Sequence, residues 1–139
     1  MLQNLTLAIA QSAVQHALQL SQQRYGGRPL SVAVCDKSGF LLAFARMEEA
    51  KLLSIELTQR KAYTAARMGA PTHVFLQRLQ QENLEISYFA DDKFSAMPGG
   101  LPVFNADKQL IGALAIGGIS AKEDLEAAEL IVAALADAL

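Results

Sequence analysis

The feature that most constrains the fold is a pair of short apolar runs joined by a tight turn, which occurs twice in the sequence. LSVAVCD at residues 30–36 is followed, after the turn KSG, by FLLAFARM at residues 40–47. LPVFN at residues 101–105 is followed, after the turn ADK, by QLIGALAIGG at residues 109–118. Two apolar runs on either side of a tight turn are typical of an antiparallel hairpin, and the β-branched alternation of LSVAVCD fits a strand. The sequence therefore predicts two β-hairpins.

Helical patterns surround the hairpins. Residues 6–23 and 52–68 repeat their apolar residues at helical spacing, and both segments are followed by glycine, which commonly ends a helix. Thr72 is placed to cap a short helix that reaches about residue 80, and residues 121–139 form a final helix with acidic residues near its start.

Residues 83–100 show no clean periodicity. We expect one short strand there, plus a loop that packs Tyr88, Phe89 and Phe94. The whole chain, residues 1–139, is then one α+β domain in which helices flank an antiparallel sheet of about five strands.

Charge and apolar content exclude several classes of partner. The net charge is −2 and there is no run of Lys or Arg, so neither nucleic acid nor an anionic membrane is expected as a partner. The first 23 residues carry no charge, but they lack a basic start and contain six glutamines, so they do not resemble an export signal. The remaining uncharged runs are too short to span a membrane. The single cysteine, Cys35, fits a reducing compartment, and we expect a cytoplasmic protein.

Two glycine doublets have several possible uses. The sequence contains neither the phosphate-loop pattern nor the dinucleotide-binding pattern. Gly117-Gly118 stands between a strand and a helix, where a plain turn is favoured over an anion site because acidic residues follow at once. Gly99-Gly100 stands between Pro98 and Pro102, so it either bends the chain at the sheet edge or lets backbone amides approach a ligand.

Two cations interrupt apolar segments. Arg46 ends the second expected strand, and Lys61 lies inside an alanine-rich helix, so each requires an anionic partner if it is buried. Asp36, Glu56 and Asp124 are the candidate internal partners. A structural salt bridge is the first expectation for Arg46, and a ligand carboxylate is the alternative.

Few residues can ligate a metal. His16 lies beside the polar stripe of the first helix, within reach of a surface or a subunit contact, and His73 is expected to be an ordinary exposed residue. Met97 can serve as a soft ligand or fill a gap. Cys35 is expected as a buried and unreactive thiol on the strand face that Ala33 shares. No pattern of residues marks a catalytic centre or a metal cluster.

Three stretches carry a family signature: SVAVCDKSGFLLAFARMEEAKLLSIELTQRKAYTAARM, MPGGLPV and LIGALAIGGISAKEDLEAAE. Together they resemble the GlcG/HbpS-type family of haem-binding and haem-degrading-like domains, which also form the C-terminal part of some cobalamin adenosyltransferases. The matching residues are Asp36, Gly39, Arg46, Met47, Ser54, Lys61, Ala62, Thr64, Pro98, Gly99, Gly100, Pro102, Gly112, Gly117 and Asp124. The departures are Cys35, Glu48-Glu49 in place of Asp-Gly, Thr58, and a shortened segment around residue 121.

The resemblance implies a profilin-like α+β domain that assembles into symmetric homo-oligomers, from dimers to octamers. It also implies binding of haem or a related tetrapyrrole or corrinoid, next to enzymes of glycolate, glycerol or diol metabolism.

The leading hypothesis is a non-catalytic accessory protein that binds such a cofactor. The expected pocket combines Arg46, Lys61, Met97 and the turn Pro98-Gly99-Gly100 with the loop of Tyr88 and Phe89, and His16 is the candidate metal ligand. The alternatives are a binder or sensor of small carboxylates, with Arg46 and Lys61 holding the acid, and a structural partner of a cobalamin-dependent dehydratase.

Overall fold

The computed structural model describes all residues from 1 to 139, and its elements confirm an α+β fold. The helices are α1 (Leu7–Arg24), α2 (Leu53–Met68), α3 (Thr72–Gln81) and α4 (Ala121–Leu135), and the strands are β1 (Ser31–Asp36), β2 (Leu41–Arg46), β3 (Gly100–Phe104) and β4 (Leu110–Gly117). Two short 3-10 helices span Ile86–Phe89 and Ala136–Ala138.

The four strands form one antiparallel sheet in the order β2-β1-β4-β3. Both predicted hairpins are present, as the pairs β1/β2 and β3/β4. The two hairpins join through β1 and β4, with Ser31 opposite Gly117 and Asp36 opposite Gly112. The central strands are almost wholly buried, whereas the edge strand β2 is partly exposed along its length.

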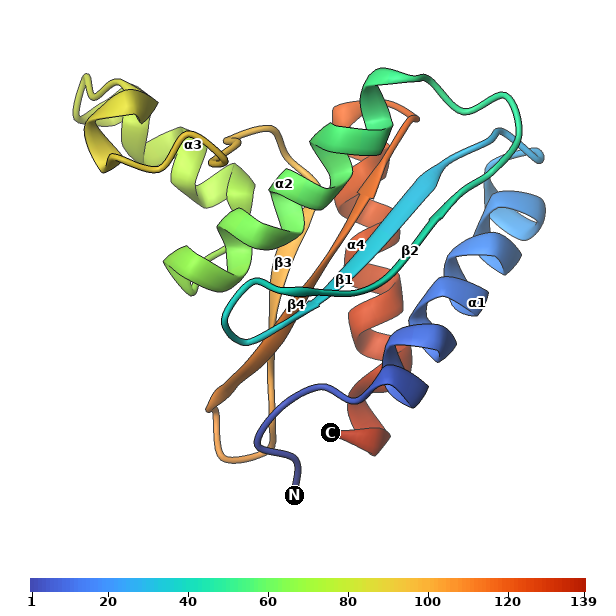
Figure 1. The fold of residues 1–139 in the computed structure, drawn as a ribbon. Helices are drawn as coiled ribbons and strands as arrows, with labels where there is room; N and C mark the ends of the chain where they lie inside the picture. Colours follow the sequence, from blue (N-terminus) through green and yellow to red (C-terminus); the bar gives the residue numbers. More distant parts are fainter.

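The helices cover the sheet on both faces. Figure 1 shows α2 crossing one face, while α1 and α4 lie side by side behind the other, and both chain termini lie at the same end of the molecule. Successive residues of a strand point to opposite faces. Val32 and Val34 therefore pack in the cluster with α1 and α4, while Ala33 and Cys35 pack in a second cluster with α2. The predicted placement of Cys35 with Ala33, as a buried thiol, is confirmed.

The segment between α3 and β3 differs from the sequence prediction. No strand forms there, so the sheet has four strands and not about five. A 3-10 helix over Ile86–Phe89 presents Phe89 to Phe75, with ring centroids 5.0 Å apart, and Phe94 packs on Phe75 at 5.8 Å. The expectation that this loop packs its aromatic residues holds for Phe89 and Phe94, whereas Tyr88 is 65% exposed. Aromatic contacts, and not a strand ladder, order this segment.

The start of α3 was also predicted wrongly. Thr72 is the first residue of the helix, and Pro71 precedes it as the N-cap without a side-chain hydrogen bond. The Thr72 hydroxyl instead accepts a hydrogen bond from the backbone N–H of Gly100 at 3.0 Å. A contact with a distant part of the chain thus replaced the local capping bond.

The helices of this protein are all too short or too polar to cross a lipid bilayer.

Candidate functional site

Lys61 is a fully buried cation at the centre of a polar cluster. Its side chain is 1% exposed, and its Nζ donates hydrogen bonds to Oδ2 of Asp124 at 3.2 Å and to the backbone oxygen of Pro98 at 3.0 Å. Burying a cation without a partner is costly, which explains why an anion lies beside it. The predicted need of Lys61 for a carboxylate is confirmed, and Asp124 is the partner.

Asp124 connects this cluster to the first turn of α4. Its Oδ1 accepts a hydrogen bond from the backbone N–H of Ile119 at 3.2 Å. Burial lowers the pKa of Lys61 and raises the pKa of Asp124, and the attraction between the two charges opposes both shifts. Ser120 caps the same helix by accepting from the N–H of Glu123. The protein's own side chains thus occupy this helix N-terminus, which favours a plain turn at Gly117-Gly118.

The two glycines of the Pro98-Gly99-Gly100 turn lie directly against this cluster. Gly99 has φ +119°, and a Cβ there would lie 2.8 Å from Nζ of Lys61. A Cβ on Gly100 would lie 2.4 Å from the backbone oxygen of Lys61. Both residues are buried, so close packing against α2 accounts for both glycines. The cluster is closely packed and connects α2, β3 and α4.

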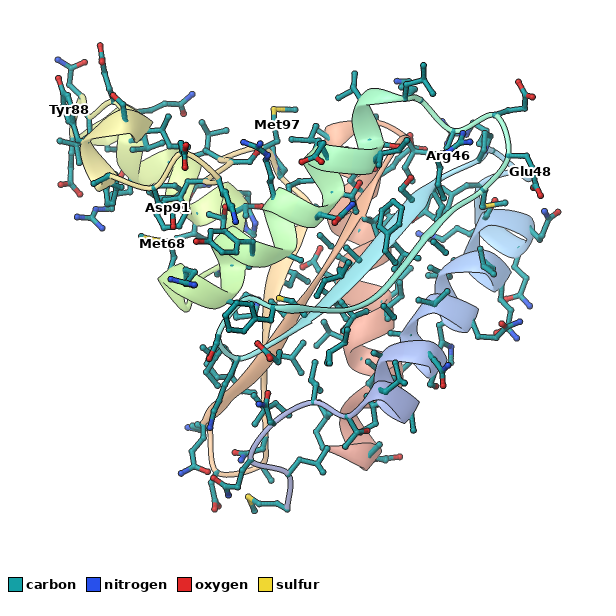
Figure 2. All side chains as sticks on the ribbon, in the orientation of Figure 1. Arg46, Glu48, Met68, Tyr88, Asp91 and Met97 are labelled. Atoms are coloured by element: carbon teal, nitrogen blue, oxygen red, sulfur yellow. The ribbon has the colours of Figure 1, made fainter.

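Arg46 does not form the expected salt bridge. It is exposed at the end of β2, and its guanidinium donates to the backbone oxygen of Ala50 at 3.2 Å. The candidate carboxylates are engaged elsewhere: Asp124 with Lys61, Glu56 with Arg60, and Asp36 with backbone amides of the hairpin turn. The exposed position explains the error, because water solvates a surface guanidinium without help from a carboxylate. Figure 2 shows Arg46 and Glu48 at the same end of the molecule.

His16 lies in a different layer from Lys61. It is half-buried in α1, at helical spacings of seven and four residues from Ile9 and Leu20, which pack on the α1/α4 core. The sheet separates α1 from α2 (Figure 1). His16 and Lys61 therefore cannot belong to one compact site within a single copy of the chain.

Met97 and the second histidine, His73, lie in other parts of the molecule. Met97, labelled in Figure 2, is 47% exposed just before the Pro98 turn. His73 was expected to be exposed but is half-buried, and its Nδ1 is buried without a hydrogen-bond partner.

Of the residues expected to form one pocket, Lys61 and residues 98–100 lie together, whereas Arg46 and Tyr88 lie elsewhere. None of the five main cavities is lined by His16, Lys61, Met97 or residues 98–100. Arg46 lines a shallow cavity with the loop that follows it. Tyr88 lies far from Arg46, at the α3 end of the molecule (Figure 2).

A cavity that sequence reasoning missed lies beside α2. It is lined by Cys35, Gly39, Leu41, Glu56, Gln59, Arg60, Tyr63 and Lys93. The positions 56, 59, 60 and 63 are spaced by three, one and three residues, so they share one side of a helix. This polar stripe was visible in the sequence, but only the fold places the hairpin turn and Lys93 opposite it. Burial raises the pKa of the Cys35 thiol to about 12, which keeps the thiol neutral.

Comparisons with known sequences point to one family. The model of the family described as "Haem degrading protein HbpS-like" matches residues 5–133. The corrinoid adenosyltransferase PduO of Salmonella typhimurium is 30% identical over 129 residues, which are 91% of this chain and 36% of that protein. The protein GlcG of Escherichia coli is 31% identical over 87 residues, 63% of each chain. The chain therefore spans about a third of the length of PduO and less than two thirds of GlcG.

Solved structures share the fold over nearly the whole chain. The Klebsiella pneumoniae protein ORFY superposes with a TM-score of 0.87 at 25% identity, covering 100% of this chain and 94% of that one. A structure of HbpS gives 0.83 at 30% identity, covering 97% and 92%. The PduOC:heme complex gives 0.81 at 29% identity, covering 94% of both chains.

Proposed function

The chain belongs to the HbpS-like family, and from this premise we propose that it binds haem or a related tetrapyrrole or corrinoid without turning over a substrate. The observation that carries the proposal is the likeness to the PduOC:heme complex, which extends over 94% of both chains. The relationship to a corrinoid adenosyltransferase makes a corrinoid the second ligand to test.

In this proposal the ligand lies at the surface of α1, and His16 is its metal ligand. His16 supplies an imidazole, which is a common axial ligand of haem iron. Arg46 is exposed and has no carboxylate partner, so it is free to bind a propionate. Met97 is the alternative thioether ligand on the other side of the sheet. In this proposal Lys61, Pro98, Gly99 and Gly100 hold the scaffold and do not touch the cofactor, because Lys61 is already neutralised by Asp124.

A second copy of the chain would complete the site. Since His16 lines none of the main cavities, a haem bound to it by one copy would lie against an open face of α1. The first 23 residues carry no charge. Leu7, at the start of α1, is also exposed. An uncharged face is self-complementary in a symmetric pair. We therefore propose that the protein forms a homo-oligomer, between a dimer and an octamer. We further propose that it acts in the cytoplasm beside enzymes of glycolate, glycerol or diol metabolism.

A hemin titration tests the proposal. We expect a saturable, shifted Soret band for the wild-type protein, and its loss in His16→Ala. His73→Ala is the matched control and should keep the band. Light scattering with and without hemin reports the oligomeric state. If His16→Ala keeps the band and Met97→Ala loses it, Met97 is the ligand and our assignment of His16 is wrong.

The absence of any saturable change with hemin would refute haem binding. The same protein titrated with cobalamin, followed by difference spectra, then decides whether the ligand is a corrinoid. If both titrations are flat, the cofactor proposal fails. Co-purification with a cobalamin-dependent dehydratase would then support the alternative of a structural partner.

A further inference from the structure

A cavity of about 310 Å³ opens between α2 and the turn of the first hairpin. Gln59, Arg60 and Tyr63 of α2 form one wall, and Leu41 and Cys35 lie opposite. Lys93, from the loop before β3, closes the side. Three separate parts of the chain thus meet around one small space, far from His16 in the sequence and on the other side of the sheet.

The lining of this cavity includes two cations, Arg60 and Lys93, and one carboxylate, Glu56. Two cations lie over the Tyr63 ring: the Lys93 ammonium is 5.7 Å from the ring centre and the Arg67 guanidinium 4.9 Å. Besides Glu56, the carboxylates near this ring are Asp91 and Asp92. Asp91 is already engaged, because it accepts the Tyr63 hydroxyl at 2.6 Å.

Neither lining cation is neutralised by a strong ion pair. Lys93 forms no ion pair with any carboxylate of the chain. Arg60 contacts Glu56 at 3.4 Å, but the two side chains are 43% and 76% exposed. Exposed pairs of this kind contribute little to stability, so an incoming anion can replace Glu56 at low cost.

The inner part of the cavity is neutral. The Cys35 thiol is 2% exposed and donates to the backbone oxygen of Ala62 at 3.5 Å. Leu41, which is 50% exposed, adds an aliphatic surface at the rim of the cavity. Gly39 lies close to the Tyr63 ring, since a Cβ there would lie 2.9 Å from Cδ2 of Tyr63. Apolar surface beside two cations matches a molecule with an apolar body and one negative end.

We propose that this cavity binds a small organic carboxylate. Its carboxylate group lies between Arg60 and Lys93, and its apolar part packs on Leu41 and the Tyr63 ring. The volume of about 310 Å³ is at the lower end of the range for ligand pockets, roughly 300–1,000 Å³, and suits a molecule of amino-acid or aromatic-acid size. The site is separate from the proposed haem ligand and does not depend on haem binding.

Titration with benzoate and with lactate, an aromatic and an aliphatic acid, tests this proposal by amide NMR. We expect at least one acid to give saturable shifts centred on Gly39, Gln59 and Lys93. Lys93→Gln should weaken that binding about tenfold, the equivalent of one charged hydrogen bond. Lys122→Gln, which removes an exposed lysine from α4, is the matched control and should leave the dissociation constant within about twofold.

Three results would overturn the proposal. The first is the absence of saturable shifts at these residues with both acids. The second is that benzamide, the neutral analogue, binds as tightly as benzoate. The third is that Lys122→Gln weakens binding as much as Lys93→Gln. The hemin titration of Lys93→Gln separates the two proposals, because haem binding should be unchanged in this variant.

Discussion

The two faces of the sheet are packed with side chains of different size. The face toward α1 and α4 is filled by large aliphatic side chains, such as Leu114 and Ile116 of β4. The face toward α2 is filled by small ones, including Ala113 and Ala115 of the same strand. Large side chains bury more apolar area, whereas small ones let a helix approach closely. The aliphatic face therefore supplies most of the hydrophobic stabilisation.

The ion pairs of the two layers differ in the same way. Arg24–Glu126 joins α1 to α4 at 2.9 Å and is half exposed, and Arg28–Glu123 is a second exposed pair in that layer. On the α2 side, Arg60–Glu56 is likewise exposed, but Lys61 of α2 also forms a buried pair with Asp124 of α4. Because the α2 layer buries little aliphatic area, specific polar contacts such as the Lys61–Asp124 pair fix its position on the sheet. The candidate sites divide accordingly: His16 belongs to the aliphatic layer, and the carboxylate cavity belongs to the α2 layer.

The largest predicted effect comes from breaking the buried pair. Asp124→Asn leaves Lys61 without a negative partner in a buried place, and we expect a loss of about 3–5 kcal/mol in the free energy of unfolding. Urea denaturation measures it. The double variant Lys61→Met/Asp124→Leu should recover much of the loss, because two apolar side chains need no partner. A cost below about 1 kcal/mol for Asp124→Asn would show that α2 is not held by this pair.

Adjacent residues of β4 test the contrast between the faces directly. Leu114→Ala should cost about 2–5 kcal/mol, because it leaves a cavity in the aliphatic core. Ala115→Leu should cost about 1–3 kcal/mol, because the added side chain forces α2 away from the sheet. Both are measured by urea denaturation. If Ala115→Leu stabilises the protein, there is spare space beneath α2 and the description of a close-packed face is wrong.

The smallest effect concerns the exposed pair Arg28–Glu123. Hydrogen bonds from Arg28 and Ser120 lower the pKa of Glu123 from 4.5 to about 2. Since the pKa is lower in the folded state, the pair stabilises the protein above pH 4.5 and this contribution is lost as the pH falls toward 2.

The urea midpoints of wild type and Glu123→Gln should therefore differ slightly at pH 7 and converge in this acidic range. A difference that stays constant with pH would mean that the charge of Glu123 plays no part. A large difference would contradict the view that exposed pairs are secondary in this layer.

The regular elements and one buried contact could be predicted from the sequence. The helical spacing and the paired apolar runs gave both hairpins and all four helices, because these patterns reflect which side of an element is buried. The position of Lys61 among alanines indicated that it would need a carboxylate or an anionic ligand if buried, and Asp124, one of the candidates, is its partner. Alternation placed Cys35 correctly on the face that Ala33 shares, and the structure shows that α2 covers this face.

The errors share a physical cause. Thr72 contacts Gly100 instead of its own helix, the segment before β3 forms a 3-10 helix on Phe75, and Arg46 stays in solvent. Each outcome depends on groups far away in the sequence, or on exposure, which a local pattern does not contain. The expected pocket is only partly assembled for the same reason: Lys61 and residues 98–100 lie together, whereas Arg46 and Tyr88 lie at distant ends of the molecule.

The sequence by itself determined the α+β class, the two hairpins, the separation of large and small residues by alternation, and the family, since these depend on local periodicity and motif. Only the tertiary structure decided that Gly99 and Gly100 pack against Lys61, that His16 and Lys61 lie on opposite sides of the sheet, and that Lys93 and Arg60 line one cavity. The reason is that distances between remote residues are set by how the layers pack, and packing is a property of the whole chain.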